Sequence, residues 1–80
     1  MSRVPLYVGE AIRAARAEAH CTQHQLARAL RIHQSVISRI ELGERHCTLH
    51  ELIAIAQALR TKPEDLFRRI VAALESPPPH

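Results

Sequence analysis

Two short segments of the chain carry residue types that bind metal ions or react as thiols. The pentapeptide HCTQH covers residues 20–24, and HCTLH covers residues 46–50. Histidine nitrogen and cysteine sulfur are the usual ligands of Zn²⁺, and two His-Cys pairs could complete a tetrahedral shell. The repeat admits two explanations: a metal site split between the segments, or one local structural solution used twice.

Each pentapeptide also contains a threonine where a helix can begin. Thr22 stands three residues before Gln25, and Thr48 stands three residues before Glu51. In this capping-box pattern the hydroxyl accepts a hydrogen bond from the backbone three residues on, and the longer side chain accepts one in return. We therefore expect both segments to open helices. This explains why the threonine recurs, but not why His-Cys precedes it.

Apolar residues at helical spacing predict five helices around these caps. We expect the first from Val8 to Ala19, the second after Thr22, the third up to Gly43, the fourth after Thr48 and the fifth from Pro63. Residues 1–7 are then an N-terminal arm, residues 8–75 one domain, and residues 76–80, SPPPH, a disordered tail.

The expected core faces of the last two helices follow from the same spacing. In the fourth helix Ile55 and Ala58 lie off the predicted stripe, which comprises Leu49, Leu52, Ile53, Ala56 and Leu59. The predicted apolar face of the fifth helix comprises Leu66, Phe67, Ile70, Val71 and Leu74.

Length and composition narrow the function classes. Eighty residues fit one domain with little room for a large ligand cavity. The formal charge is +3, and ten of the eleven cationic residues are Arg, whose side chain suits hydrogen bonding to phosphate and guanine.

We see neither a membrane span nor a secretory signal, so we expect a cytoplasmic protein with reduced thiols. No catalytic motif or phosphate-binding glycine loop is recognisable, so we predict no enzyme and no cofactor.

Residues 23–42 have the pattern of a short helix, a turn and a second short helix. The string TQHQLARAL, followed by RIHQSVISRIELGER, resembles the helix-turn-helix of the phage repressor and Cro type, also called the XRE family. The resemblance runs roughly from Ile12 to Phe67. It implies a compact all-α five-helix bundle of the lambda-repressor-like type, acting as a sequence-specific transcriptional regulator, most simply a repressor or controller protein.

The resemblance also assigns DNA-binding roles. The exposed face of the recognition helix, lying in the major groove, would comprise Gln34, Ser35, Ser38 and Arg39, with Arg39 reading a base such as guanine. Gln23 would clamp a phosphate at the start of the preceding helix. Arg13 and Arg45 are further, less strongly indicated phosphate contacts.

Other positions bear on the fold around the motif. Arg16 and Glu41 match a pair that links the first helix to the recognition helix, and we expect a structural ion pair there. Arg31 departs from the family pattern, because the turn usually has glycine and a left-handed arginine costs about 1 to 2 kcal/mol. His33 replaces the usual Ser or Thr cap, and Cys47 replaces a common proline.

One short recognition helix buries little surface, so we expect a homodimer on double-stranded DNA, bound to an inverted-repeat operator. The expected dimer interface consists of apolar residues left over from the core: Ile55, Ile70, Val71 and Leu74.

Two alternatives stay open. The chain could be an antitoxin that neutralises a protein toxin and regulates its own operon. It could instead respond to a metal or to thiol oxidation through its HCT segments. In the family fold these segments lie apart, so we expect no metal site within one chain.

Overall fold

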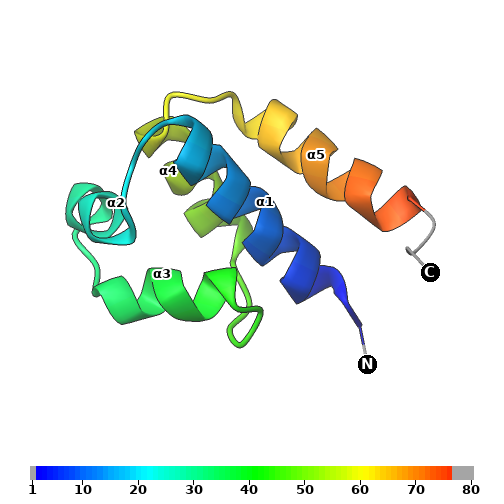
Figure 1. Ribbon diagram of the computed structural model, residues 1–80, viewed down its shortest axis with the longest axis horizontal. Helices are drawn as coiled ribbons and strands as arrows, with labels where there is room; N and C mark the ends of the chain where they lie inside the picture. Colours follow the sequence, from blue (N-terminus) through cyan, green and yellow to red (C-terminus); the bar gives the residue numbers. More distant parts are fainter. Residues whose placement is uncertain (1, 77–80) are drawn as a thin grey trace.

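Helix α1 (Val4–Glu18) is the first helix of the computed structural model, which describes residues 2–76. The helices that follow are α2 (Gln23–Leu30), α3 (Gln34–Glu41), α4 (Leu49–Ala58) and α5 (Pro63–Glu75). α1 packs against α3 and α5, α2 packs against α3 and α4, and α4 packs against α5 (Figure 1). The expected all-α five-helix fold is confirmed, and residues 2–76 contain no strand.

The two predicted capping boxes are confirmed. Thr22 Oγ1 accepts a hydrogen bond from the Gln25 amide at 3.0 Å, and Gln25 Oε1 accepts one from the Thr22 amide at 2.9 Å. Thr48 and Glu51 repeat both bonds at the start of α4, at 3.1 and 2.9 Å. Each box satisfies two backbone N–H groups that a helix start leaves unpaired. The recurrence of threonine in the HCT segments therefore has a structural cause.

Three helices end on a non-glycine residue in the left-handed conformation. These residues are His20 after α1, Arg31 after α2 and Arg60 after α4, with φ of 54°, 57° and 58°. In each case the next backbone N–H bonds back across the last turn, as Thr61 N does to Ala56 O at 2.9 Å. This closure turns the chain sharply at a backbone cost of about 1 to 2 kcal/mol per residue.

The core lies where α1, α2, α3, α4 and α5 meet. It is aliphatic, and its largest fully buried side chains are Ile12, Leu26, Ile37, Ile40, Ile55 and Leu66. Gly9 lets α1 approach α3 closely, because a Cβ there would lie 2.5 Å from the carbonyl oxygens of Ile40 and Glu41. The approach fixes the orientation of α3 against α1.

The predicted core stripe of α4 is partly wrong. Leu49 and Ile53, expected inside, are 69% and 38% exposed, while Ile55, expected off the stripe, is 1% exposed. α4 is apolar nearly all round, so its periodicity does not select a face, and packing against α2 and α5 does. In α5, Leu66 and Ile70 are buried as expected, but Phe67 is 56% exposed.

The ends of the domain also differ from expectation. α1 begins at Val4, so residues 4–7 are helical and not an arm, and Pro5 lies in the first turn, where it costs no hydrogen bond. α5 begins at Pro63 as predicted. Ser76 ends α5 by donating its hydroxyl to Ala72 O at 2.9 Å. The rest of the predicted tail, residues 77–80, lies outside the described residues.

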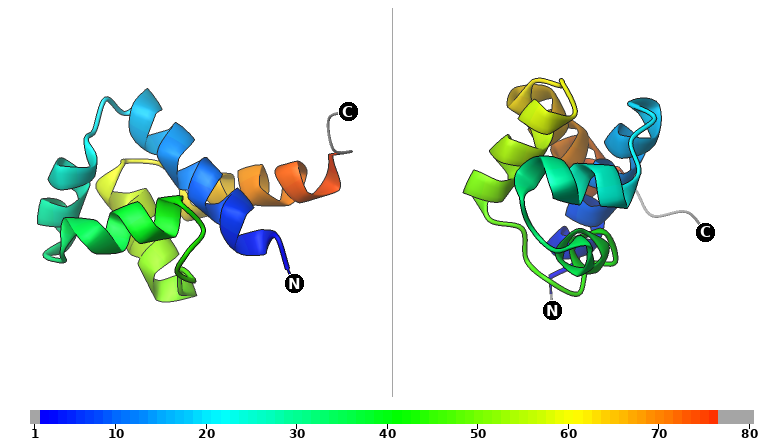
Figure 2. Two further views of the ribbon diagram at one scale, coloured as in Figure 1. Left: turned by 60° about the horizontal axis from the view of Figure 1, so that its bottom comes forward. Right: turned by 90° about the vertical axis from the view of Figure 1, so that its left-hand side faces the viewer.

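Figure 2 shows that the C-terminal part of α5 extends beyond the other helices. None of the helices in the described chain has the length and apolar character needed to cross a membrane.

Candidate nucleic-acid interface

The turn between α2 and α3 sets how the recognition helix is presented. Arg31 adopts φ 57° and ψ 44°, the left-handed conformation for which glycine was expected. Ile32 N donates to Ala27 O at 3.0 Å and closes the turn. His33 precedes α3 and makes no side-chain cap hydrogen bond. The turn therefore has the backbone of a glycine turn, with an arginine side chain projecting from it.

α3 separates its apolar side from its polar side. Ile37 and Ile40 are buried, whereas Gln34, Ser35 and Arg39 are exposed and Ser38 is half-buried. With its side chains an α-helix is about 10 to 12 Å across, which fits the major groove of DNA, about 12 Å wide. The exposed side offers an amide, hydroxyls and a guanidinium, which are the groups that read base edges.

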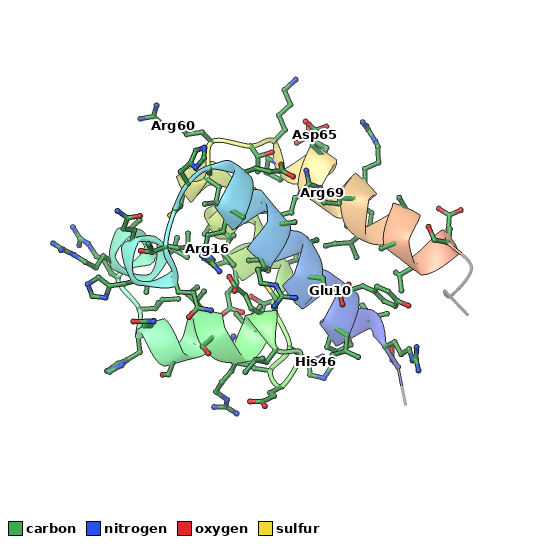
Figure 3. The ribbon with its side chains drawn as sticks, viewed as in Figure 1. Glu10, Arg16, His46, Arg60, Asp65 and Arg69 are labelled. Atoms are coloured by element: carbon green, nitrogen blue, oxygen red, sulfur yellow. The ribbon has the colours of Figure 1, made fainter. Side chains whose placement is uncertain are left out.

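A buried ion pair ties α3 to α1. Arg16 Nε lies 2.7 Å from Glu41 Oε2, and Arg16 Nη2 lies 3.0 Å from Glu41 Oε1. Arg16 Nη1 also donates to Cys21 O at 2.9 Å. The Glu41 side chain is only 3% exposed, and its hydrogen bonds raise the pKa of Arg16. Figure 3 shows Arg16 pointing from α1 toward α2 and α3.

The same carboxylate positions two amides of the predicted interface. Gln23 Nε2 donates to Glu41 Oε1 at 3.0 Å, and Gln34 Nε2 donates to Gln23 Oε1 at 3.4 Å. The chain of contacts from Arg16 through Glu41 and Gln23 reaches Gln34 at the first turn of α3. Residues from α1, α2 and α3 therefore share one polar network, and Gln23 keeps one amide hydrogen for a further acceptor.

The two other arginines proposed for phosphate contact differ in their surroundings. Arg45 holds Glu51 at two points, 3.0 and 2.9 Å, and also donates to His46 O at 3.3 Å. The pair raises the pKa of Arg45 and lowers that of Glu51 to about 2, chiefly through the hydrogen bond from Arg45. Sequence reasoning missed this partner. Arg13 is exposed on α1 and has no ion pair within the described chain.

Charge is unevenly distributed along the chain. Residues 19–40 contain no acidic residue but contain three arginines and three histidines. Glu41, which follows, is buried and paired. The exposed ion pairs lie on α5: Arg68 with Asp65, and Arg69 with Glu18 of α1. The surface formed by residues 19–40 is therefore positive, and the next exposed acidic residue is Glu44, after the end of α3. A positive surface of this kind favours a polyanionic partner.

The two HCT segments do not gather around one point. Among residues 2–76, no three His, Cys, Asp or Glu side chains are placed to hold a metal ion. Cys21 Sγ and Cys47 Sγ each donate to the carbonyl of the following threonine at 3.5 Å. Burial raises the pKa of Cys47 to about 11, so this thiol is protonated and weakly nucleophilic at neutral pH.

The predicted dimer interface needs correction. Ile55 and Ile70 are 1% and 4% exposed, so both complete the core and cannot contact a partner. The apolar surface that α4 and α5 do expose lines a hollow of about 700 Å³ with Leu49, Ile53, Phe67 and Val71. We call it the α4–α5 apolar surface; Leu74, 41% exposed, extends it along α5.

Known proteins share this arrangement. The helix-turn-helix family model matches residues 12–66 of the chain. The clp gene regulator ClgR from C. glutamicum has a similar structure at 22% identity, with 96% of this chain and 100% of that chain covered and a TM-score of 0.87. The restriction-modification controller protein C.AhdI from Aeromonas hydrophila is 26% identical, with 82% and 100% covered and a TM-score of 0.77.

A second controller protein, wild-type C.Esp1396I, is 24% identical, with 98% of this chain and 100% of that chain covered and a TM-score of 0.86. No curated protein sequence matches the chain.

Proposed function

The chain belongs to the helix-turn-helix family of the phage repressor and Cro type and is a DNA-binding transcription regulator, and on this premise we propose that it occupies an inverted-repeat operator as a homodimer. The observation that carries the proposal is the exposed polar side of α3, held in place by the buried Arg16–Glu41 pair. A regulator acts where the DNA is, so we place the chain in the cytoplasm.

Within this proposal the residues divide by role. Arg39 reads a base through its forked guanidinium, and Gln34, Ser35 and Ser38 contact base edges beside it. Gln23 positions the protein on a phosphate, with Arg13 as a further phosphate contact. Arg45 is a weaker phosphate candidate, because Glu51, which it holds at two points, offsets part of its positive charge.

Two copies are needed because α3 alone covers few base pairs. An isologous dimer presents two recognition helices, which match half-sites about 10 base pairs apart. The α4–α5 apolar surface supports a dimer because Phe67 and Leu49, at 56% and 69% exposure, are costly to leave in water. We propose this surface as the interface, with Val71 and Leu74 retained from the expected set.

We propose binding and not catalysis as the activity. The side chains gathered around α3 are amides, hydroxyls and guanidinium groups, which recognise DNA without forming or breaking bonds. The antitoxin alternative has one observation in its favour, since the α4–α5 apolar surface could receive a different protein. The oligomeric state of the purified chain distinguishes the homodimer from the antitoxin. A homodimer buries the α4–α5 apolar surface between its own two copies, whereas the antitoxin would leave it exposed until a toxin binds.

The test is selection from random DNA duplexes, together with sedimentation, for the wild type and for two variants of α5. Phe67→Glu places a charge on the α4–α5 apolar surface, and Ala72→Glu places one at an exposed position outside it. We expect the wild type and Ala72→Glu to sediment as dimers and to enrich an inverted repeat. Phe67→Glu should sediment as a monomer and lose this enrichment.

A wild-type monomer at micromolar concentration would contradict the dimer, and enrichment of no sequence would contradict specific binding. If Phe67→Glu still formed a dimer, the interface would not be the α4–α5 apolar surface.

A further inference from the structure

A second hollow lies at the turn between α2 and α3, with a volume of about 410 Å³. Its polar lining comprises His24, Arg28, Arg31, His33 and Gln34. Four of these five side chains are basic, and all five are exposed. None of His24, Arg28, Arg31 and His33 belongs to the exposed side of α3 or to the proposed phosphate contacts of Gln23, Arg13 and Arg45.

The positive charge of this hollow is not neutralised by the protein. No acidic residue occurs between Glu18 and Glu41, and Glu41 is 3% exposed and paired with Arg16. Within the described chain neither Arg28 nor Arg31 takes part in an ion pair or a side-chain hydrogen bond. Like charges close together on a helix repel one another, and a bound anion relieves that repulsion.

The position of the hollow indicates which anion it meets. The first helix of a helix-turn-helix crosses the DNA backbone while the second enters the major groove. Gln34 belongs both to the hollow and to the exposed side of α3. The hollow therefore adjoins the N-terminal end of the recognition helix, where the phosphates that flank the groove lie.

We propose that this hollow binds a phosphate diester of the DNA backbone through Arg28 and Arg31, which line it together with His24 and His33. The proposal rests on DNA binding by α3 and adds a phosphate contact separate from that of Gln23. Because a phosphate contact carries no sequence information, it strengthens binding to all duplexes alike.

The chain supplies a matched control for Arg31. Arg60 is exposed, ends α4 in the same left-handed conformation, and has φ 58° against 57° for Arg31. Figure 3 places Arg60 on the side of the molecule opposite to α3. Replacing either arginine with glutamine removes one charge at an equivalent backbone position, so only their positions relative to DNA differ.

The experiment titrates the selected operator and a scrambled duplex with wild type, Arg28→Gln, Arg31→Gln and Arg60→Gln at salt concentrations from about 50 to 200 mM. We expect Arg28→Gln and Arg31→Gln to weaken binding to both duplexes on the order of tenfold and to reduce the salt slope by about one. Arg60→Gln should bind like the wild type. A thermal melt of each variant confirms that it is folded.

Binding by Arg28→Gln and Arg31→Gln that matches Arg60→Gln would overturn the proposal. So would a change of base preference in either variant, because it would make the hollow a base-reading site. Failure of the proposed function looks different: the wild type would not distinguish operator from scrambled duplex, whatever the variants do.

One further measurement completes the test. Inorganic phosphate is the probe for a small-anion site: histidine NMR shifts on its addition, with DNA binding unchanged in the arginine variants, would overturn a DNA contact.

Discussion

Arg16 of α1 and Glu41 at the end of α3 form a two-point ion pair, with contacts of 2.7 and 3.0 Å, and the Glu41 side chain is 3% exposed. Through Gln23 the same carboxylate reaches Gln34. The pair therefore does two things: it joins two helices inside the fold, and it fixes the amides at the start of the recognition helix.

Breaking this pair should destabilise the fold strongly. Glu41→Ala strands the Arg16 guanidinium in a largely buried position, and we expect the free energy of unfolding to fall by about 3 to 5 kcal/mol. Urea denaturation, monitored by circular dichroism, measures this free energy of unfolding. Glu18→Ala, which breaks the exposed Glu18–Arg69 pair, is the control and should change little. Equal effects of the two substitutions would mean that the buried pair adds nothing.

Gly9 should resist replacement by alanine. In an ordinary helix interior Gly→Ala stabilises by about 0.5 to 1 kcal/mol, but here the added methyl group would lie 2.5 Å from two carbonyl oxygens of α3. We expect Gly9→Ala to destabilise by about 1 to 3 kcal/mol, measured by urea denaturation. Ala14→Gly, at an exposed position of α1, calibrates the helix propensity. A stabilising Gly9→Ala would show that α1 and α3 are less closely packed.

Replacing Arg60 with glycine should stabilise the fold. Its φ of 58° costs an L-residue about 1 to 2 kcal/mol, which glycine avoids at a smaller entropic cost. We expect Arg60→Gly to raise the melting temperature by several degrees, read by thermal circular dichroism. Arg60→Ala keeps the strained backbone and should give no such increase. If both variants melt alike, the left-handed conformation is not the source of the effect.

The Arg45–Glu51 pair should make stability depend on acid pH. The pKa of Glu51 is lowered from 4.5 to about 2, chiefly by the hydrogen bond from Arg45. A lowered folded-state pKa stabilises the protein above pH 4.5, and this contribution is lost as the pH falls from 4.5 toward 2. We expect the difference in unfolding free energy between wild type and Glu51→Gln to be constant above pH 4.5 and to shrink below it.

Glutamine suits this comparison because Gln25 serves as the capping partner in α2, so the cap of α4 should survive. A difference that stays constant down to pH 2 would contradict the assigned cause.

The helix starts could be predicted from sequence because their geometry is local. A capping box is complete within four residues, so Thr22 with Gln25 and Thr48 with Glu51 carry all the necessary information. The left-handed residues that follow three helices could not be predicted, because His20, Arg31 and Arg60 are not glycine and their types give no signal for a positive φ.

The core face of α4 could not be predicted, because leucine, isoleucine and alanine occur on every side of that helix. Only contacts with other helices place Ile55 inside and Leu49 outside, and the same error put Ile55 in the expected dimer interface. The pairing of Arg45 with Glu51 was missed because the capping box already explained Glu51. One carboxylate serves both, with Oε1 accepting from the Thr48 amide and from Arg45.

The recognition-helix assignment is tested most directly by repeating the duplex selection with Arg39→Ala. Arg39 is exposed on α3, and its replacement should cost about 1 to 3 kcal/mol of binding free energy. We predict that base preference relaxes at one position in each half-site, symmetrically, while the rest of the operator is still selected. An unchanged preference at every position would contradict the placement of α3 in the major groove.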